Sequence, residues 1–230
     1  MRVLGIETAT LVCGAAVAAD GRVMADAWVE SRNVHAERLM SLIDEALRGA
    51  ETGLGAIDAI AVSTGPGSFT GLRIGVSVAK GLAYATGKPL VGVPTLTAIA
   101  ERAARESRQR VPEIIVPLLD ARRGEVYYQM FRSEGGAAVP LAGPQVARVA
   151  EVQTLLAGRQ VLITGEAAEK GVEAGRTGGG AVLAEQALAR CSAGMVALLG
   201  ETMVRAGLTV DPASLEPRYI KEFFLRAPQS

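Results

Sequence analysis

The fold is decided by one stretch, Ser63-Thr64-Gly65-Pro66-Gly67-Ser68-Phe69-Thr70-Gly71-Leu72-Arg73-Ile74-Gly75. It follows a short apolar run, Ile57 to Ser63, that predicts a buried strand. It leads into a helical pattern from about Thr70 to Thr86. The glycines at its centre free the backbone to turn sharply between the two elements. The stretch therefore predicts a buried strand, a tight turn and a helix in direct succession.

The same turn has the chemistry of an anion site. The start of the following helix presents unpaired N–H groups and the positive end of the helix dipole, and Ser68 and Thr70 could add hydroxyl donors. It is not a P-loop, because no Gly-Lys-Ser/Thr follows at the required spacing. Two interpretations stay open: a phosphate-binding turn built on Gly65, Gly67, Ser68 and Thr70, and a plain turn with Ser68 or Thr70 as the helix N-cap.

Around this stretch, the order of elements predicts a mixed five-stranded sheet with helices on its faces. Upstream lie three strand-like runs, with Asp20-Gly21 as a two-residue hairpin signal, followed by a helical pattern that Gly49 ends. Downstream lie a strand, Leu90 to Val93, and a helix, Thr95 to Arg110. We expect residues 1–110 to form a first lobe, completed by about 208–230.

A smaller second lobe is expected over residues 111–207, with Val111-Pro112 as the boundary. The runs Ile114 to Asp120 and Glu125 to Phe131 predict a hairpin around residues 121–124. Opposite charges at Asp120, Arg122 and Arg123 favour a structural ion pair there over a catalytic acid. A helix (149–156), a strand (161–164), a glycine-rich loop (171–180) and a helix capped by Ser192 are expected to follow.

A second candidate site lies between the first two predicted strands. Glu7 ends a buried strand and Thr8 follows in the turn, which is where actin-like ATPases hold magnesium and phosphate. Ala9 stands where a glycine would let the backbone approach a phosphate. A solvated hairpin turn is the alternative.

Small residues recur every four positions in the predicted helix, at Gly71, Gly75 and Ala79. Glycine inside a helix costs about 1 kcal/mol relative to alanine, so a close approach by another backbone is the usual reason. The neighbour is either the chain's own sheet or a helix of another subunit. The preceding helix offers a companion stripe of His35, Leu39, Leu42 and Ile43, in which His35 is expected to form hydrogen bonds at the helix entry.

Composition excludes several classes of protein. The 230 residues carry 24 Lys+Arg and 24 Asp+Glu, and this balance argues against a stand-alone nucleic-acid binder. Any RNA role would need cations from a partner or from a local patch. One histidine and two cysteines rule out paired-histidine and four-thiolate metal sites. With no signal peptide or apolar run of membrane-spanning length, we expect a cytoplasmic protein without a membrane partner.

The glycine-rich stretch resembles the TsaB (also called YeaZ) family, together with Ile6-Glu7-Thr8-Ala9-Thr10, His35, Asp120-Ala-Arg-Arg-Gly-Glu-Val-Tyr127 and Glu216-Pro-Arg-Tyr-Ile-Lys221. The resemblance implies an α/β actin-like (ASKHA) fold of two ribonuclease-H-like lobes, the second reduced. It departs from the family at Glu7, where relatives usually have Asp.

The resemblance also implies a function. The chain would be a non-catalytic scaffold that pairs with TsaD, the subunit that threonylcarbamoylates the tRNA adenosine beside the anticodon, and the ATPase TsaE would join them. The small-residue spacing would then serve a four-helix interface with TsaD, made by His35, Leu39, Leu42, Ile43, Gly71, Leu72, Gly75, Val76 and Ala79.

Several further expectations accompany the scaffold. The chain would have no intrinsic cofactor, with ATP or ADP at the joint between subunits as an option. It would bind tRNA only through the complex and form a homodimer when alone. The alternative is an actin-fold ATPase or phosphotransferase acting through Glu7, Thr8 and residues 65–71.

Overall fold

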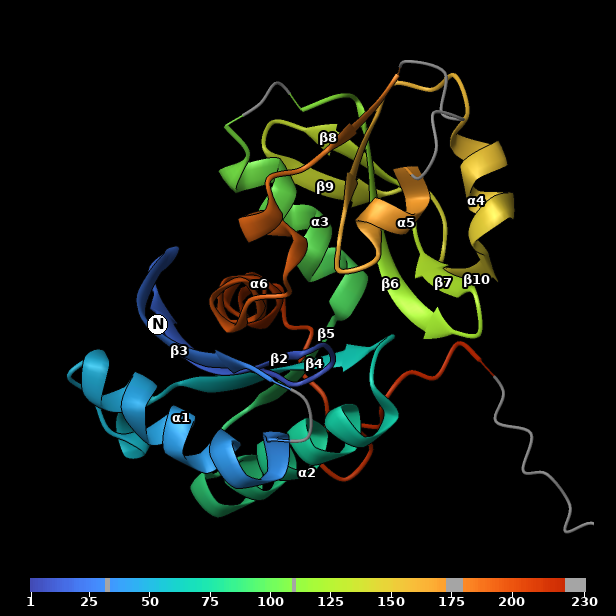
Figure 1. Cartoon of the computed structure of the whole chain (residues 1–230). Coiled ribbons are helices and arrows are strands. Elements are labelled where there is room, and N and C mark those ends of the chain that lie inside the picture. Colours follow the sequence, from blue (N-terminus) through green and yellow to red (C-terminus); the bar gives the residue numbers. More distant parts are fainter. Residues whose placement is uncertain (32–33, 109–110, 173–179, 222–230) are drawn as a thin grey trace, which may run out of the picture.

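The computed structural model describes residues 1–31, 34–108, 111–172 and 180–221. In this part of the chain two sheets lie one above the other, with helices between them and on their outer faces (Figure 1). The two lobes expected from the sequence are therefore present.

The first sheet has the predicted five strands in the order β3-β2-β1-β4-β5. Its strands are β1 (Arg2–Glu7), β2 (Val12–Ala19), β3 (Arg22–Glu30), β4 (Ala59–Gly65) and β5 (Leu90–Pro94). The first three pair antiparallel, while β4 and β5 continue in parallel from β1. At the β2–β3 turn, Asp20 and Gly21 have φ of 51° and 76°, the left-handed conformation that a tight hairpin needs. The predicted mixed sheet is confirmed.

Helices cover both faces of this sheet. On one face lie α1 (His35–Gly49) and α2 (Phe69–Thr86), side by side in Figure 1. On the other face α6 (Ala193–Arg205) packs against β1, β2 and β4, and α3 (Thr95–Glu106) lies between α6 and the second sheet. The expected second lobe of 111–207 would include α6, whereas the structure places α6 on the first sheet.

The second lobe contains more strands than the sequence predicted. They are β6 (Ile114–Arg122), β7 (Glu125–Tyr128), β8 (Phe131–Glu134), β9 (Ala137–Pro140), β10 (Gln145–Arg148), β11 (Val161–Thr164) and β12 (Ala181–Leu183), with α4 (Val149–Leu156) and α5 (Ala168–Val172) on the outer face. The helix capped by Ser192 is confirmed as α6. Part of the glycine-rich loop, residues 173–179, lies outside the described residues.

The predicted single strand from Glu125 to Phe131 is divided in two. Both β7 and β8 pair with β6 in one continuous antiparallel register, in which Leu118 faces Tyr128 and Ile115 faces Phe131. In that register Pro117 lies opposite Gln129. Because proline has no N–H to donate, the ladder is interrupted there and resumes on the other side.

The chain returns to the first lobe after α6. We call residues 208–221 the C-terminal strap. Near its start, the N–H of Val210 donates to the carbonyl of Leu90 at 2.9 Å. Leu215 is buried in the first core, and the N–H of Arg218 donates to the carbonyl of Thr64 at 2.7 Å. Lys221 then reaches the second lobe, where its Nζ donates to the carbonyl of Ala121 at 3.2 Å. The described part of the expected 208–230 completion thus contacts the first lobe.

No helix among residues 1–31, 34–108, 111–172 and 180–221 is long and apolar enough to cross a membrane.

The close contact between α6 and the first sheet gives a test of the fold. A Cβ added at Gly200 would overlap the side chain of Ala61. We expect Gly200→Val to lower the free energy of unfolding by about 2–3 kcal/mol, because an overpacked interior has to shift. Urea unfolding measures this. Gly53→Val is the matched control, since no atom lies within 4 Å of a Cβ at Gly53; equal losses in the two variants would contradict the packing.

Candidate functional site

The Glu7 carboxyl group closes its own turn. Its Oε1 accepts hydrogen bonds from the N–H of Ala9 at 2.7 Å and of Thr10 at 3.1 Å, and from the Thr10 hydroxyl at 3.4 Å. The Thr10 hydroxyl accepts in turn from the N–H of Val12 at 3.2 Å. The backbone donors that would have held a phosphate in this turn therefore bind the chain's own carboxyl group. The predicted solvated turn is in fact buried.

The glycine-rich stretch packs directly onto this turn. A Cβ added at Gly67 would overlap the carbonyl oxygen of Ala9, one at Gly71 that of Thr8, and one at Gly75 the Thr8 hydroxyl. The N–H of Ser68 donates to the carbonyl of Ala9 at 2.7 Å. The two candidate phosphate-binding segments are thus in contact, and each fills the space of the other. We call this contact the turn–glycine contact.

Ser68 is the helix N-cap, as one of the two interpretations predicted. Its hydroxyl accepts from the N–H of Gly71 at 3.3 Å. Thr70 is exposed in the first turn of α2. Gly65 has φ of 113° and lies against the strap, because a Cβ there would be 2.7 Å from the carbonyl oxygen of Arg218. The predicted phosphate ligands are therefore neighbours, and the N–H groups of Thr8, Gly65 and Ser68 donate within the chain.

The electrostatics of Glu7 also oppose a magnesium site. Burial raises the pKa of this carboxyl group, and the Cys191 and Ser63 side chains and the N–H groups of Ala9 and Thr10 offset that effect only in part. Its Oε2 has no hydrogen-bond partner among the described residues. An enclosed carboxyl group whose ionisation is opposed by burial is a poor ligand for a hard cation. In the described part of the chain, no three His, Cys, Asp or Glu side chains gather as metal ligands.

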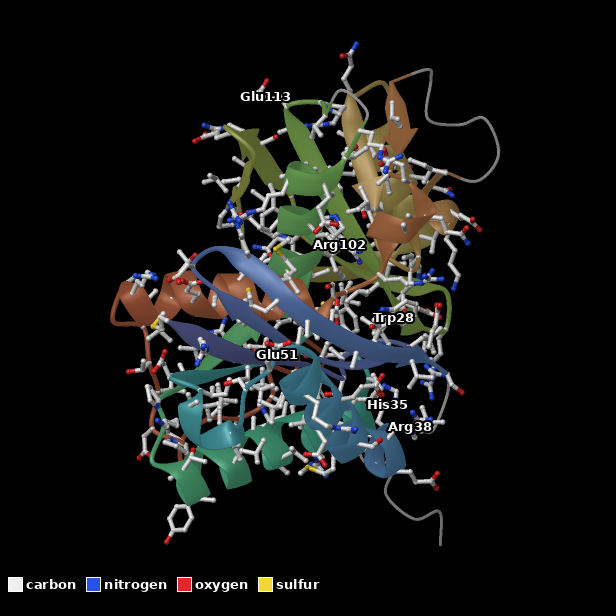
Figure 2. The ribbon with its side chains drawn as sticks, turned by 90° about the vertical axis from the view of Figure 1, so that its left-hand side faces the viewer. Trp28, His35, Arg38, Glu51, Arg102 and Glu113 are labelled. Carbon is white, nitrogen blue, oxygen red and sulfur yellow. The ribbon has the colours of Figure 1, made fainter. Side chains whose placement is uncertain are left out.

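His35 forms the predicted hydrogen bond at the helix entry. It is buried at the start of α1, below the first sheet in Figure 2, and its Nε2 lies 3.1 Å from the carbonyl oxygen of Thr10. The nearby Cys13 thiol contacts the backbone carbonyl of His35 at 4.0 Å. Burial and the negative charge of Glu7 raise the pKa of Cys13 to about 11, the opposite of an activated nucleophile.

All residues of the predicted four-helix interface are buried within the chain, namely His35, Leu39, Leu42, Ile43, Gly71, Leu72, Gly75, Val76 and Ala79. Their side chains face the first sheet or the turn after β1. The spacing of Gly71 and Gly75 is explained by the turn–glycine contact, which corrects its assignment to a helix of another subunit.

The outer face of α2 carries a second row of small residues, which the sequence analysis missed. Ser77, Gly81 and Ala85 are exposed and recur every four positions. No atom of the chain lies within 4 Å of a Cβ added at Gly81. Beside this row the Tyr84 side chain is 89% exposed, and Met40 on the adjacent α1 is 48% exposed. Gly81, a further glycine within the predicted helix, was the feature of the sequence that could have revealed this second row.

A small pocket of about 150 Å³ opens between the lobes, beside Trp28 of β3 and Arg102 of α3 (Figure 2). Its two arginines are already engaged. Arg190 pairs with Glu30 at 2.7 Å and lies over the Trp28 ring, while Arg102 donates to Glu106 and to the carbonyl of Arg190.

The ion pair predicted within the β6–β7 hairpin, between Asp120 and its arginines, is wrong in its partner, because Asp120 pairs with a lysine of α5. Asp120 pairs with Lys170 at 3.2 Å and accepts from the N–H of Arg122 at 2.9 Å. Burial opposes ionisation, but the Arg122 N–H and the Lys170 ammonium together lower the pKa of Asp120.

Comparison with known proteins agrees with this architecture. The family model for TsaD, tRNA N6-adenosine threonylcarbamoyltransferase, matches residues 29–211. The TsaB protein of Escherichia coli, a tRNA threonylcarbamoyladenosine biosynthesis protein, is 39% identical over 137 residues, 59% of this chain and 58% of that protein. The chain thus matches less than two thirds of this relative's length.

Solved structures show the same fold over nearly the whole chain. A Pseudomonas aeruginosa protein described as similar to the peptidase YeaZ has a TM-score of 0.81 at 27% identity, covering 96% of this chain and 99% of that one. Component A of (R)-2-hydroxyglutaryl-CoA dehydratase from Acidaminococcus fermentans has a TM-score of 0.52 at 12% identity. The match covers 89% of this chain and 99% of that chain, and it shows a likeness of fold alone. The predicted actin-like fold is confirmed.

The turn–glycine contact predicts which substitutions can be rescued. Gly75→Ala should lower the free energy of unfolding by about 1–2 kcal/mol, because overpacking outweighs the gain in helix propensity. Adding Thr8→Ala should restore most of the loss, since the overlapping atom is the Thr8 hydroxyl. Gly71→Ala should not be rescued, since its overlap is with the Thr8 backbone. Urea unfolding of the single and double variants tests this; rescue of both glycine variants, or of neither, would contradict it.

The buried Glu7 predicts a pH dependence. Its pKa is higher in the folded chain than in the unfolded one, so its contribution to stability is full below the unfolded pKa and is lost as pH rises through the folded pKa. Glu7→Gln keeps an acceptor for Ala9 and Thr10 and cannot ionise. We expect the variant to gain stability relative to the parent as pH rises from about 5 to 8. Thermal unfolding across pH measures this, with the exposed Glu45→Gln as control; a loss of stability at every pH would show that the carboxylate ion is needed.

Proposed function

Because the chain belongs to the tRNA N6-adenosine threonylcarbamoyltransferase family, among its TsaB/YeaZ members, we propose that it is a non-catalytic subunit in the synthesis of threonylcarbamoyladenosine in tRNA. In this role it pairs with TsaD and makes that subunit competent to modify the adenosine beside the anticodon.

This proposal rests on the exposed small residues of the outer face of α2. Glycine in a helix interior costs about 1 kcal/mol relative to alanine, so Gly81 calls for a reason. The chain's own packing supplies none, because the space beside Gly81 is open. A helix from another subunit, packed closely over Ser77, Gly81 and Ala85, gives that reason and covers the exposed Tyr84 ring. The surface made by these residues is the proposed docking surface for TsaD.

The turn–glycine contact supports a scaffold over the alternative ATPase or phosphotransferase. A phosphate at Glu7, Thr8 and residues 65–71 would need the N–H groups of Ala9, Thr10 and Ser68, which donate within the chain. Such a ligand would also have to separate α2 from the turn after β1. A peptidase activity, which the description of the Pseudomonas aeruginosa structure mentions, is disfavoured here by the raised pKa of Cys13 beside the backbone of His35.

We propose the remaining partners from the resemblance to the TsaB family. TsaE joins the pair, tRNA binds only to the assembly, and ATP or ADP lodges at the joint between subunits rather than in this chain. In isolation the same helix face pairs with its own copy about a twofold axis, giving a homodimer.

Gly81 provides the test. Gly81→Trp should fold, because the space around position 81 is open, yet it should abolish the mixed peak that the parent forms with TsaD on a sizing column with light scattering. Gly81→Ala should stabilise the isolated chain by about 1 kcal/mol. Gly53→Trp, also at an open position, is the matched control.

A mixed peak that survives Gly81→Trp would move the interface elsewhere. Turnover of ATP by the lone chain would contradict the non-catalytic role. Gly75→Trp is unsuited to this test, because it would disrupt the core beside Thr8.

A further inference from the structure

We propose that Arg73, Arg122, Arg123 and Arg218, the arginine patch, bind the phosphate backbone of the RNA substrate at the junction of the two lobes. This inference rests on the proposed function, since it takes tRNA to be the substrate of the assembly.

The C-terminal strap brings these arginines together from three distant parts of the sequence. Arg218 lies in the strap, over Thr64 and Gly65. One residue later, the Tyr219 hydroxyl accepts from Arg73 Nε of α2 at 3.2 Å. Lys221 then contacts Ala121 and Glu125, on either side of Arg122 and Arg123. Figure 1 shows the end of the strap beside the β6–β7 hairpin and near the first turns of α2.

The acids around the patch are mostly neutralised by lysines rather than by these arginines. Glu125 pairs with Lys221, and Asp120 pairs with Lys170. Among the residues that the structure describes, Arg122, Arg123 and Arg218 make no ion pair, and all three are exposed. Among the strap residues that the structure describes near the patch, Glu216 is the remaining exposed acid. The patch is therefore a local excess of positive charge on a chain of zero net charge.

The backbone of the β6–β7 hairpin is unfavourable for the residues it carries. Arg122, Arg123 and Gly124 have φ of 67°, 54° and 76°. The left-handed region is one that arginine avoids and that asparagine or glycine adopts readily. The β2–β3 hairpin meets the same need with Asp20 and Gly21. Two arginines held in strained conformations, with their charges outward, point to a role outside the fold.

RNA is the partner that the surrounding chemistry fits. Arginine binds phosphate through two donors at once, and it does so at exposed positions without a preformed pocket. The neighbouring Phe69 and Tyr219 rings, whose centroids are 5.1 Å apart, place aromatic surface beside the cations, as in proteins that bind single-stranded RNA. Arg73 is exposed on α2, so the patch adjoins the proposed docking surface. RNA bound to the partner could thus reach it.

The test distinguishes the effect of the arginine charges on RNA binding from their effect on the stability of the hairpin. Arg122→Gly with Arg123→Asn installs residues suited to the turn, so the melting temperature should be unchanged or higher while RNA binding falls. The probe is an unmodified tRNA transcript, bound to the assembly of this chain with TsaD. We expect its Kd to rise about tenfold, and the slope of log K against log salt to fall by about 1.4, or 0.7 for each lost contact with single-stranded RNA. Arg22→Gln with Arg159→Gln, also two exposed arginines, is the charge-matched control.

Each outcome decides the proposal. Loss of RNA binding in the patch variant and not in the control supports it, whereas equal Kd values overturn it. If the patch variant no longer binds TsaD, the patch is a protein interface and the proposal fails. If the parent chain itself does not bind TsaD, the proposed function fails. In that case, binding of the transcript to the lone chain at about 50 mM salt tests whether the arginine patch binds RNA. Equal binding by the parent and the variant overturns the proposal.

Discussion

The turn–glycine contact determines how the rest of the first lobe is arranged. Thr8 and Ala9 project into a row of glycines in which any side chain would overlap them. This contact sets the distance between β1 and α2, and His35 joins α1 to the same turn through the carbonyl of Thr10. The inner faces of both helices are consequently buried in the core. Whatever these helices bind, they must bind with their outer faces.

The same contact changes the chemistry of the segments that make it. The turn after β1 and the loop before α2, which both offered candidate phosphate ligands, touch each other. Glu7 folds back onto its own turn and is enclosed, and the N–H of Ser68 in the loop donates to the carbonyl of Ala9. The two candidate phosphate-binding segments therefore occupy each other's space.

The sequence predicted the first lobe well, because each of its elements has a strong local signal, such as Asp20-Gly21 at the hairpin and Ser68 at the helix start. It predicted the second lobe less well, since strands of three or four residues leave little pattern and Pro117 interrupts β7 and β8 from across the sheet. The spacing of Gly71 and Gly75 correctly indicated a close neighbour. It could not identify that neighbour as Thr8, because the two segments are far apart in the sequence and meet only in the folded structure.

Residues that are unfavourable in their local structure fall into two groups: those that the packing of the chain explains and those that it does not. Gly71 and Gly75 are unfavourable in a helix, but the chain itself supplies the reason, so they indicate nothing outside it. Gly81 on the opposite face, and Arg122 and Arg123 in their left-handed turn, are unfavourable with no internal compensation. The strap links α2 to that turn through Tyr219 and Lys221. The two proposed surfaces, the outer face of α2 and the arginine patch, are therefore connected through Arg73 and the strap.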